Sequence, residues 1–266
     1  MSLVKRKLTV NVLDKEVVYD GTEQSFSDYE LGDDTTFAYD DRPVTEIITK
    51  ATEVCENTPI DLKLKIFNAS GEEVTDFYDL KVNKGNLTIK KREIEITGRN
   101  FEETYDGKPH TFGEFDLSEK TPLADGQEIT VAAASSFTVV GEYENDLTAT
   151  IKDENNVDVS KNYSVTVFPG NVTINKRELK VVTASDTFTY DGEAHSVEGF
   201  TIDETTPLAE GQEFVASGYG RFTHAGEYEN EITFDVTSTE NSETVSTKNN
   251  YEITVTAGTV AINHRD

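Results

Sequence analysis

Apolar and polar residues alternate with a period of two in many short stretches of the chain. Leu8, Val10 and Val12 show the pattern early in the sequence, and Val165 and Val167 show it farther on. Because successive side chains of a strand point to opposite faces, this alternation predicts strands with one buried and one solvated face. Thr, Val, Ile, Tyr and Phe dominate these stretches, which suits a pleated, half-buried surface. Long helices with capping signals are absent, so we expect an all-β chain.

Turn sequences separate the predicted strands at short intervals. Asp-Gly pairs occur at 106–107, 125–126 and 191–192, and a Pro-Gly pair occurs at 169–170. An Asp-Gly pair supplies the positive φ angles that hairpin turns need. Several short strands with regular turns are typical of a small sandwich. We therefore expect small immunoglobulin-like β-sandwiches.

The sequence contains three similar repeats with a period of about 85 residues. We expect three domains: repeat 1 at residues 1–90, repeat 2 at 91–175 and repeat 3 at 176–266. A Tyr-Asp-Gly motif occurs in every repeat, and a Gly-Glu-Tyr-Glu-Asn element occurs in repeats 2 and 3. The motif residues are Tyr19, Asp20, Gly21, Tyr105, Asp106, Gly107, Tyr190, Asp191, Gly192, Gly141, Tyr143, Gly226 and Tyr228.

Short, strand-like junctions connect the repeats. Ile89-Lys-Lys-Arg-Glu93 opens repeat 2, and Ile174-Asn-Lys-Arg-Glu178 opens repeat 3. No Pro- or Gly-rich linker lies between the units, so we expect a semi-rigid, extended array. Related sequences occur at Leu3–Lys7 and at Ile262–Asp266. We therefore expect this chain to be a segment of a longer array.

Repeat 1 has diverged from the other two. Its residues 35–42 replace the sequence Thr-Pro-Leu-Ala-(Asp/Glu)-Gly-Gln-Glu found at 121–128 and 206–213. Residues 43–55 show helix-like spacing, but the aligned stretches of the other repeats are β, so we expect strand there too. Cys55 is the one cysteine of the chain, which excludes an intrachain disulfide and a zinc site built from several thiolates.

The chain is strongly acidic, with 24 Lys and Arg against 51 Asp and Glu and a formal net charge of −27. A field of this sign repels phosphate backbones and anionic lipid headgroups. No apolar run approaches the roughly 20 residues that a membrane span needs, and no signal peptide is recognised. We expect no nucleic-acid binding, no membrane insertion and a monomer.

The sequence offers no motif for catalysis. A Gly-x-Ser-x-Gly elbow, a phosphate loop, a dinucleotide fingerprint and a basic stripe are all missing. His110 and His195 take equivalent places in different repeats, so they are not expected to share a metal ion. With 51 acidic residues, close carboxylate pairs carry no information. We expect no enzyme, no catalytic residue and no bound cofactor other than calcium.

Calcium is the one metal for which the sequence supplies a candidate loop. Asp153, Asn155 and Asp158 are the candidate ligands, because calcium prefers carboxylate and amide oxygens. The loop lacks the glycine and the terminal glutamate of an EF-hand, and the equivalent loop of repeat 3 differs. The alternative interpretation is a solvated β-hairpin loop, and both remain open at this stage.

The Tyr-Asp-Gly motif allows two interpretations. In the first, it forms a ligand-facing turn whose aromatic ring stacks on a sugar. In the second, it forms a hairpin turn in which the glycine adopts positive φ, the aspartate binds local amides and the tyrosine packs against the core. Its recurrence in every repeat favours the second interpretation. The Thr-Pro-Leu-Ala loop likewise suits a shaped turn with its leucine tucked inward.

The order of the motifs resembles the YDG- and MBG-type tandem repeats of bacterial surface proteins, which occur mostly in Gram-positive and gut-associated species. The shared order is Tyr-Asp-Gly-x-x-His, Gly-x-Tyr-x-Asn, Asn-Tyr-x-(Ile/Val)-x-Val and Gly-x-(Leu/Val)-x-Ile. Repeat 1 has Gln24 where the histidine is expected and lacks the Gly-x-Tyr-x-Asn element. The remaining matching residues are His110, Asn145, Asn162, Tyr163, Gly170 and Ile174 in repeat 2, and His195, Asn230, Asn250, Tyr251, Gly258 and Ile262 in repeat 3.

The resemblance implies an extracellular module at the bacterial cell surface or in a secreted protein. We expect a non-catalytic structural and adhesive segment, a stalk that presents a distal domain and contacts host glycans, mucin or matrix protein. The alternative is a carbohydrate- or mucin-binding lectin-like module, which an exposed row of Tyr or Phe at one domain end would favour. The resemblance brings no catalytic residues.

Overall fold

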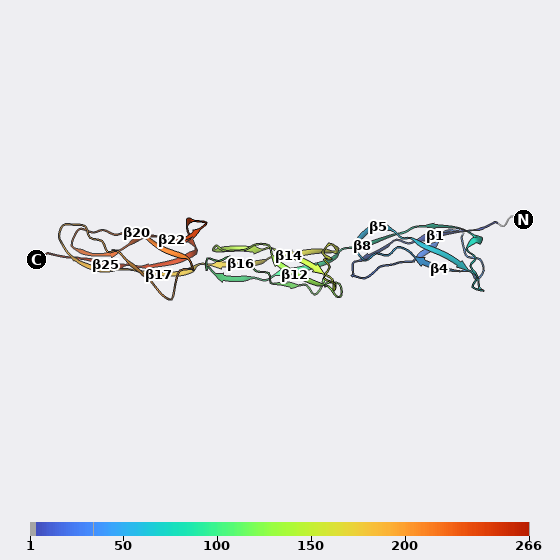
Figure 1. Cartoon of the computed structure of the whole chain (residues 1–266), viewed down its shortest axis with the longest axis horizontal. Coiled ribbons are helices and arrows are strands. Elements are labelled where there is room, and N and C mark those ends of the chain that lie inside the picture. The colour runs from blue at the N-terminus through green and yellow to red at the C-terminus, as the bar shows by residue number, and fades with distance from the viewer. Residues whose placement is uncertain (1–3, 34, 266) are drawn as a thin grey trace. The chain divides into compact units, whose positions relative to one another are not determined.

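The computed structural model describes residues 4–33 and 35–265, and these are nearly all β (Figure 1). Strands take up 56% of the structure, and no α-helix occurs among the described residues. The predicted all-β class is confirmed, with the strands arranged in multiple small sheets. Leu3 and Asp266 of the expected junction sequences lie outside the described residues. Within the described ranges, 3₁₀ turns occur at η1 (Thr75–Phe77), η2 (Ser160–Asn162) and η3 (Lys248–Asn250).

The first sheet of each repeat has the strand that opens the repeat at its centre. A short strand pairs with this central strand antiparallel, and a later strand pairs with it parallel. The orders are β3-β1-β7, β11-β9-β15 and β19-β17-β24. The strands are β1 (Arg6–Val12), β3 (Tyr29–Leu31), β7 (Tyr78–Asn83), β9 (Arg92–Gly98), β11 (Phe115–Leu117), β15 (Tyr163–Phe168), β17 (Arg177–Thr183), β19 (Phe200–Ile202) and β24 (Tyr251–Thr256).

The second sheet of each repeat has the strand that ends the repeat at its centre, again with one parallel and one antiparallel neighbour. The orders are β2-β8-β5, β10-β16-β13 and β18-β25-β21. The strands are β2 (Lys15–Val18), β5 (Cys55–Pro59), β8 (Asn86–Lys90), β10 (Phe101–Thr104), β13 (Gly141–Asn145), β16 (Gly170–Asn175), β18 (Asp186–Thr189), β21 (Gly226–Asn230) and β25 (Gly258–Asn263).

The third sheet is an antiparallel hairpin, extended by one strand in repeat 3. The orders are β4-β6, β12-β14 and β20-β22-β23. The strands are β4 (Arg42–Ile47), β6 (Leu62–Phe67), β12 (Glu128–Ala133), β14 (Leu147–Lys152), β20 (Gln212–Tyr219), β22 (Ile232–Glu240) and β23 (Glu243–Ser246). The same three-sheet plan therefore recurs in all three repeats.

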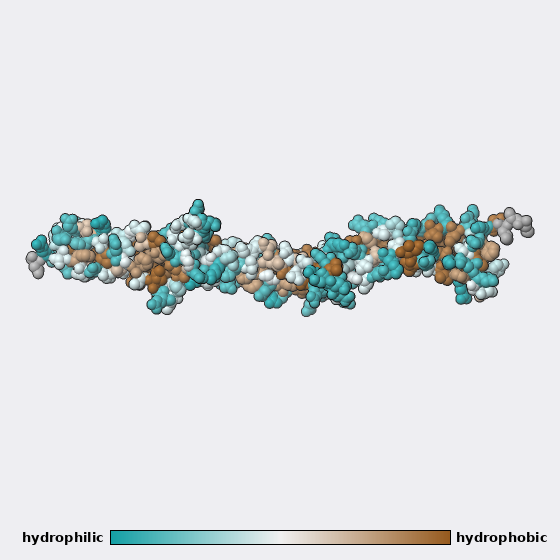
Figure 2. Space-filling model, in the orientation of Figure 1, coloured by the Kyte–Doolittle hydropathy of each residue, from teal (hydrophilic) through white to brown (hydrophobic). Residues whose placement is uncertain are grey.

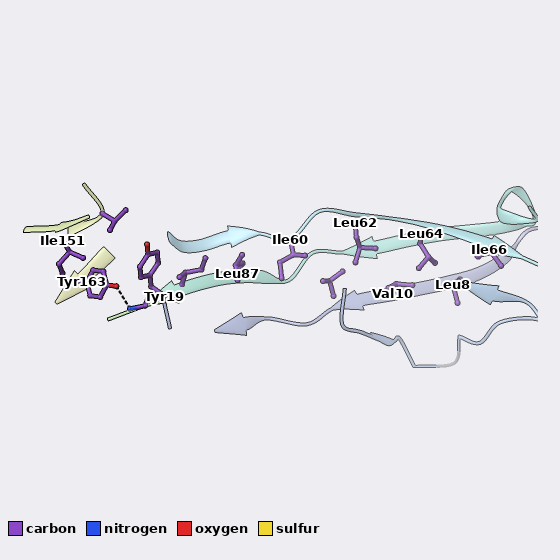
Figure 3. Close-up of a cluster of buried hydrophobic side chains, with 14 of the residues drawn as sticks. Leu8, Val10, Tyr19, Ile60, Leu62, Leu64, Ile66, Leu87, Ile151 and Tyr163 are labelled. Atoms are coloured by element: carbon purple, nitrogen blue, oxygen red, sulfur yellow. Dashed lines mark hydrogen bonds between the residues drawn. The ribbon is translucent and has the colours of Figure 1, made fainter. Parts of the chain in front are cut away.

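Among the described residues, buried apolar side chains form two clusters, each of which extends over parts of two neighbouring repeats. Leu8 of β1, Leu64 of β6 and Leu87 of β8 are buried in one cluster, and their side chains point between the strands in Figure 3. The alternating burial of β1 and β6 matches the alternating sequence that predicted these strands. Burial of apolar surface in this way contributes about 25 cal/mol per Å² and is the main stabilising term of such a sandwich.

One residue separates the last strand of a repeat from the first strand of the next. β8 ends at Lys90 and β9 begins at Arg92, while β16 ends at Asn175 and β17 begins at Arg177. A junction this short leaves few backbone torsions free. This direct connection from strand to strand agrees with the junction that the sequence predicts.

By its contacts the chain divides into two compact units. Unit 1 holds the chain up to residue 97 together with 115–131 and 148–168. Unit 2 holds 98–114, 132–147 and the chain from 169 onward. The domain boundaries expected at residues 90 and 175 stay predictions, as does the extended arrangement of the array.

The divergent stretch at residues 43–55 is not helical. It contributes the strand β4 and then a segment that is joined to Gln24 by an isolated bridge at Ala51. Cys55 begins β5 and pairs with Ile89, as Gly141 pairs with Ile174 in repeat 2. Cys55 thus occupies the structural place of the glycine, and its thiol is half-buried.

Hydrophilic side chains cover much of the face shown in Figure 2, with hydrophobic side chains in separate patches. No Asp, Glu, Lys or Arg side chain is buried among the described residues. Large aromatic side chains that remain exposed among the described residues are Tyr39, Phe77, Phe168 and Tyr190.

Candidate functional site

Each Tyr-Asp-Gly motif lies beside the strand that ends its own repeat. The backbone N–H of Tyr19 donates to the carbonyl of Lys90 at 2.9 Å, and Tyr105 donates to Asn175 at 2.9 Å. Tyr190 makes the same bond to Asn263, also at 2.9 Å. The motif is therefore held at the end of its repeat where the next repeat starts.

The aspartate and glycine of the motif form a tight turn. The glycines have φ angles of +82° at Gly21, +80° at Gly107 and +88° at Gly192, a region that L-residues rarely adopt. Asp106 Oδ1 accepts the N–H of Lys108 at 2.9 Å and contacts His110 Nε2 at 2.8 Å. These contacts occupy the carboxylate with local partners.

The other two turns use the same arrangement. Asp191 Oδ1 accepts the N–H of Glu193 and contacts His195 Nε2 at 3.0 Å. In repeat 1, Gln24 Nε2 donates to Asp20 at 2.9 Å, from the position that the histidine holds in the other repeats. A glutamine at this position therefore replaces the histidine without loss of the turn contact.

The tyrosine of the motif reaches out of its own repeat and into the next one. Tyr19 is 2% exposed, and its ring meets the edge of Tyr163 with centroids 5.5 Å apart at 77°. Tyr19 and Tyr163 belong to one buried cluster, although they lie in different repeats. Figure 3 shows the two rings together at one end of this cluster. The tyrosine thus extends the apolar core across the junction.

A glutamine connects the two tyrosine hydroxyls. Gln127 Nε2 donates to the hydroxyl of Tyr19 at 2.8 Å, and Gln127 Oε1 accepts from the hydroxyl of Tyr163 at 2.5 Å. The Tyr163 hydroxyl in turn accepts the N–H of Ala124 at 3.0 Å. An amide side chain can donate on one side and accept on the other, whereas an ionised carboxylate only accepts.

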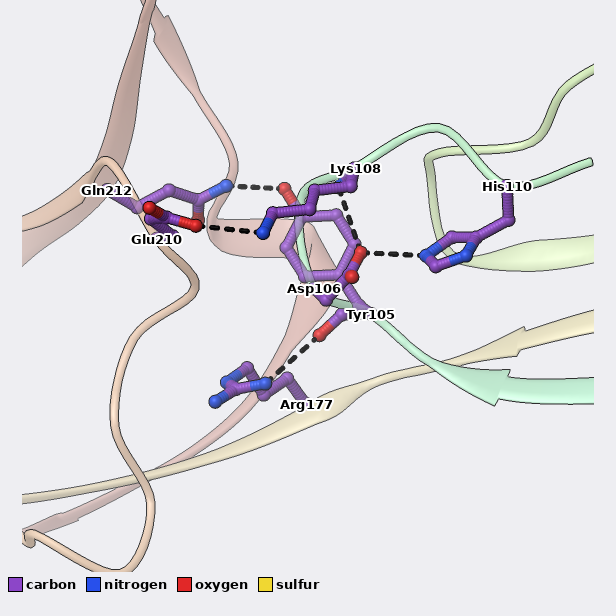
Figure 4. A network of polar contacts seen from close by, with 7 residues as sticks. All are labelled: Tyr105, Asp106, Lys108, His110, Arg177, Glu210 and Gln212. Carbon is purple, nitrogen blue, oxygen red and sulfur yellow. Dashed lines mark hydrogen bonds and ion pairs between the residues drawn. The ribbon is translucent and has the colours of Figure 1, made fainter.

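The junction between repeats 2 and 3 repeats these contacts (Figure 4). Gln212 Nε2 donates to Tyr105 at 2.6 Å, and Gln212 Oε1 accepts from Tyr251 at 2.6 Å. The rings of Tyr105 and Tyr251 meet at 5.6 Å and 79°, and Tyr105 is 3% exposed. Ala209 donates its N–H to Tyr251 at 2.9 Å. The two junctions thus agree contact for contact.

An arginine from the junction sequence also takes part. Arg92 Nε donates to the carbonyl of Pro122 at 2.6 Å, and its Nη1 lies 3.4 Å from the carbonyl of Tyr19. Arg177 does the same with Pro207 at 2.6 Å and Tyr105 at 3.5 Å. The arginine thus positions the Thr-Pro-Leu-Ala loop beside the tyrosine of the preceding repeat.

A buried asparagine makes a second connection. Asn162 Oδ1 accepts the N–H of Val54 at 3.0 Å, and Asn250 Oδ1 accepts the N–H of Val140 at 3.2 Å. Both asparagines are buried, and each stands directly before Tyr163 or Tyr251 in the sequence. This hydrogen bond connects a second loop of the preceding repeat to the junction.

We call each of these sets a tyrosine joint. Joint 1 lies within unit 1 and joint 2 lies within unit 2. Ion pairs accompany them at Glu53–Lys161 (2.5 Å) and Lys108–Glu210 (2.8 Å), although exposed pairs add little to stability. Joint 1 consists of Tyr19, Val54, Arg92, Gln127, Asn162 and Tyr163, and joint 2 of Tyr105, Val140, Arg177, Gln212, Asn250 and Tyr251.

Replacing Gln212 by glutamate should weaken joint 2 by about 2 kcal/mol, since the donor to Tyr105 is lost and a charge enters a partly buried site. Gln212→Ala is the companion variant, because it removes the contacts without adding charge. Urea unfolding of both variants at pH 7 measures the effect. A Gln212→Glu protein with the stability of the parent would contradict the role given to the amide.

Burial raises the pKa of the Tyr163 and Tyr251 hydroxyls above the usual value. Both hydroxyls therefore stay protonated at neutral pH and keep the proton that they donate to the glutamine. The Asp106 pKa is lowered: burial raises it, but the N–H of Lys108 and the ring of His110 outweigh that effect. For Asp191, the N–H of Glu193 and then His195 lower the pKa.

These lowered pKa values predict loss of stability in acid. An aspartate whose pKa is lower in the folded state than its unfolded value of about 3.9 stabilises the fold above that pH and loses the effect as pH falls through the folded pKa. Scanning calorimetry from pH 7 to about pH 2.5 should show a smaller acid-induced fall in Tm for Asp106→Asn than for the parent. Asparagine keeps the turn acceptor, so equal falls would show that the charge at Asp106 does not contribute.

The Gly-Glu-Tyr-Glu-Asn element has a local structural part. The Tyr143 ring lies over Gly141, where a Cβ would come within 2.9 Å of the hydroxyl, and that hydroxyl donates to Val139 at 2.8 Å. Tyr228 donates likewise to His224 at 3.1 Å, above Gly226. The two residues are not part of the joints.

The asparagine that ends the element is completely buried. Asn145 Nδ2 donates to Phe112 at 2.6 Å, and Asn230 Nδ2 donates to Val197 at 3.0 Å. Each bond connects β13 or β21 to the loop that follows the Tyr-Asp-Gly turn.

The calcium candidates lie in a hairpin loop of unit 1. Asp153 Oδ1 accepts the N–H groups of Asn155 and Val157, each at 2.9 Å, and Asp158 Oδ1 accepts the N–H of Ser160 at 2.9 Å. Asp153 and Asn155 border a groove of about 310 Å³ beside joint 1, which Asp158 does not line. No group of three or more His, Cys, Asp or Glu side chains within residues 4–33 and 35–265 is placed to hold a metal ion. Calcium binding stays a hypothesis.

The sequence did not identify the partners of the tyrosine, namely the glutamine, arginine and asparagine. A signal for them was present: the glutamine and asparagine recur in repeats 2 and 3 but not in repeat 1. Asp41 takes the place of the glutamine there, with its Oδ2 accepting from Tyr78 at 2.6 Å, and Phe77 takes the place of the asparagine. Both residues are present where a preceding repeat docks onto them.

No helix in the part of the chain that the structure describes is long and apolar enough to cross a membrane. No protein-family model matches the chain, and no curated protein matches its sequence.

Among solved structures, the chain is similar to the N-terminal four Ig domains of Dscam1 isoform 9.44, crystallised with zinc. Identity is 11%, coverage is 97% of this chain and 73% of that one, and the TM-score is 0.18. A second is SGBP-B from the mixed-linkage glucan utilization locus of Bacteroides ovatus, in complex with a mixed-linkage heptasaccharide. Identity is 10%, coverage is 96% and 67%, and the TM-score is 0.14. TM-scores this low carry no inference about what the chain binds.

Proposed function

We propose that the chain is a non-catalytic structural segment of a bacterial surface protein, in which the tyrosine joints hold successive repeats as a semi-rigid stalk. The observation that carries this proposal is the agreement of the two joints contact for contact. Each joint buries a tyrosine of one repeat in the next and satisfies its hydroxyl with a glutamine. A binding surface for an external ligand does not need such a contact between neighbours.

Two further properties support the stalk. One residue separates the strands at each junction, so the connection adds little freedom. The net charge of −27 is of the kind that disfavours self-association of a repeat array. The bacterial surface location rests on the resemblance of the repeats to YDG- and MBG-type sequences. Host glycans, mucin or matrix protein remain the proposed partners of the stalk or of the domain it presents.

Small-angle X-ray scattering tests the stalk. The parent chain should scatter as an elongated, stiff particle, and the Tyr19→Ala/Tyr105→Ala double variant should show a broader range of conformations. Tyr190→Ala is the matched control, because the same motif residue is removed where no joint is formed. A compact globular particle for the parent would contradict the proposal.

A lectin-like module is the second candidate, and exposed aromatic side chains of repeat 1 favour it. Tyr39 is fully exposed and Phe77 is 59% exposed. They are sequence neighbours of Ala38 and Tyr78, which hydrogen-bond to each other at 2.8 Å. Exposed aromatic rings of this kind suit stacking on a sugar ring.

A glycan and mucin array, run with calcium and with chelator, tests this second candidate. Saturable binding that Tyr39→Ala abolishes would support it, and binding lost only with chelator would assign calcium a part. Absence of saturable binding in both conditions would leave the stalk as the better supported function.

A further inference from the structure

We propose that the exposed Tyr190 face of repeat 3 docks a further β-domain, one that presents the glutamine, tyrosine and asparagine of a tyrosine joint. Tyr190 is 41% exposed, whereas Tyr19 and Tyr105 are 2% and 3% exposed. The backbone around all three is the same, since each donates its N–H to the end of its repeat at 2.9 Å. The difference therefore lies in what covers the ring.

The glycine of the Tyr-Asp-Gly motif is likewise covered in repeats 1 and 2 and open in repeat 3. A Cβ on Gly21 would meet Gln127 Nε2 at 3.0 Å, and one on Gly107 would meet Gln212 Nε2 at 3.1 Å. A Cβ on Gly192 would meet nothing within 4 Å. Gly192 keeps a turn that in the other repeats allows the glutamine of the next repeat to approach closely.

The arginine that such a joint needs is also present. Arg265 follows Ile262 by three residues, as Arg177 follows Ile174 and Arg92 follows Ile89. Arg177 contacts both the Pro207 carbonyl of the next repeat and the Tyr105 carbonyl. Arg265 is exposed and takes the corresponding sequence position beside the Tyr190 face.

The chemistry of the face selects its partner. At both joints the motif tyrosine hydroxyl accepts an N–H from a glutamine side chain, and that glutamine accepts from a second tyrosine. Repeat 1 of a second copy does not supply it, because Asp41 has no N–H to donate and Phe77 has no amide. The partner is therefore a domain of the repeat 2 or repeat 3 kind. This inference rests on the joints but not on the bacterial surface role.

Nitration with tetranitromethane, read by peptide mass spectrometry, measures the exposure of each tyrosine. In the 266-residue chain, Tyr190 should be nitrated while Tyr19 and Tyr105 are protected. A longer chain is then made by adding a second copy of residues 93–175 after Arg265, which supplies Gln127, Asn162 and Tyr163 to the new junction. Nitration of Tyr190 should fall to the level of Tyr105 in the parent.

Two companion chains keep the test decisive. Gln127→Ala in the added copy alone should restore nitration of Tyr190. In the second companion chain, residues 178–266 are added instead, so the chain contains two identical copies of the Tyr190 peptide. About half of that peptide should be nitrated, because only one of the two copies stays exposed.

Equal, full nitration of Tyr190 in the parent and in both longer chains would overturn the inference. If Tyr19 and Tyr105 are still protected in that case, the joints and the stalk stand and only the docking face is wrong. Protection of Tyr190 that rises with concentration of the parent would show that a second copy is the occupant, which also overturns the assignment.

Discussion

Replacing Tyr105 by alanine should destabilise the chain by about 3–5 kcal/mol, the usual cost of truncating a buried aromatic residue. The ring is 3% exposed and packs on Tyr251, and its hydroxyl accepts from Gln212. The variant leaves a cavity at joint 2 and a partly buried amide without its acceptor. Denaturant unfolding followed by far-UV circular dichroism measures the change.

The chain supplies its own control for this substitution. Tyr190→Ala removes the same motif residue from the same kind of turn, but from an exposed position, so we expect a cost of about 0.5 kcal/mol or less. Tyr105→Phe removes the hydroxyl alone and should cost about 1 kcal/mol. Equal losses for Tyr105→Ala and Tyr190→Ala would mean that the tyrosine stabilises its own turn and not the joint.

Replacing Gly170 by alanine should cost about 3 kcal/mol, at the upper end of the range for overpacking. The added Cβ would overlap the backbone carbonyl of Arg99, and it would lie 2.8 Å from the carbonyl oxygen of Gly98. A backbone does not move aside as a flexible side chain does, and a strand glycine often marks such an approach. Gly85 and Gly258 face the same conflict in repeats 1 and 3, with Leu13 and Thr183.

Gly218→Ala is the matched control, because Gly218 also lies in a strand, β20. A Cβ added there would have as its nearest neighbour a Thr233 side-chain atom at 3.8 Å. We expect that variant to be neutral or to gain about 0.4–1 kcal/mol from lower entropy of the unfolded chain. Thermal unfolding of both variants separates the two cases. A Gly170→Ala protein as stable as Gly218→Ala would show that the strand shifts to admit the methyl group.

Local alternation predicted strands such as β1, whereas β4 was expected from the aligned stretches of the other repeats. Leu8, Val10 and Val12 are all buried in β1 because the period of two places them on one face. The short junction at Lys91 was also predicted, because the sequence there contains no Pro- or Gly-rich linker. These features depend on neighbours along the chain, which a single sequence records.

The tyrosine joint could not be predicted in the same way. Tyr19 and Gln127 lie 108 residues apart, and nothing in the alternation connects them. The repeat showed that both residues recur, but recurrence suits a turn residue and a contact residue equally. The interpretation of Tyr-Asp-Gly as a turn accounted for the aspartate and glycine, while the tyrosine required the position of the next repeat.

The divergence of repeat 1 becomes intelligible in these terms. Asp41 and Phe77 replace the glutamine and asparagine of the joint, while Arg6 still donates to Thr36 as Arg92 donates to Pro122. The arginine shapes the loop of its own repeat, so it is needed in every repeat. The glutamine contacts the motif tyrosine of the preceding repeat and the asparagine contacts a second loop of that repeat, so both residues act only at a joint.

The central claim is that the tyrosine joint fixes the orientation of neighbouring repeats, and a distance distribution across joint 2 tests it most directly. Spin labels at Glu103→Cys and Glu252→Cys, in a Cys55→Ser background, place one exposed label on each side of the joint. Double electron–electron resonance should give a narrow distribution for the parent and for Tyr190→Ala, and a broad one for Tyr105→Ala. An equally broad distribution in all three proteins would contradict the claim.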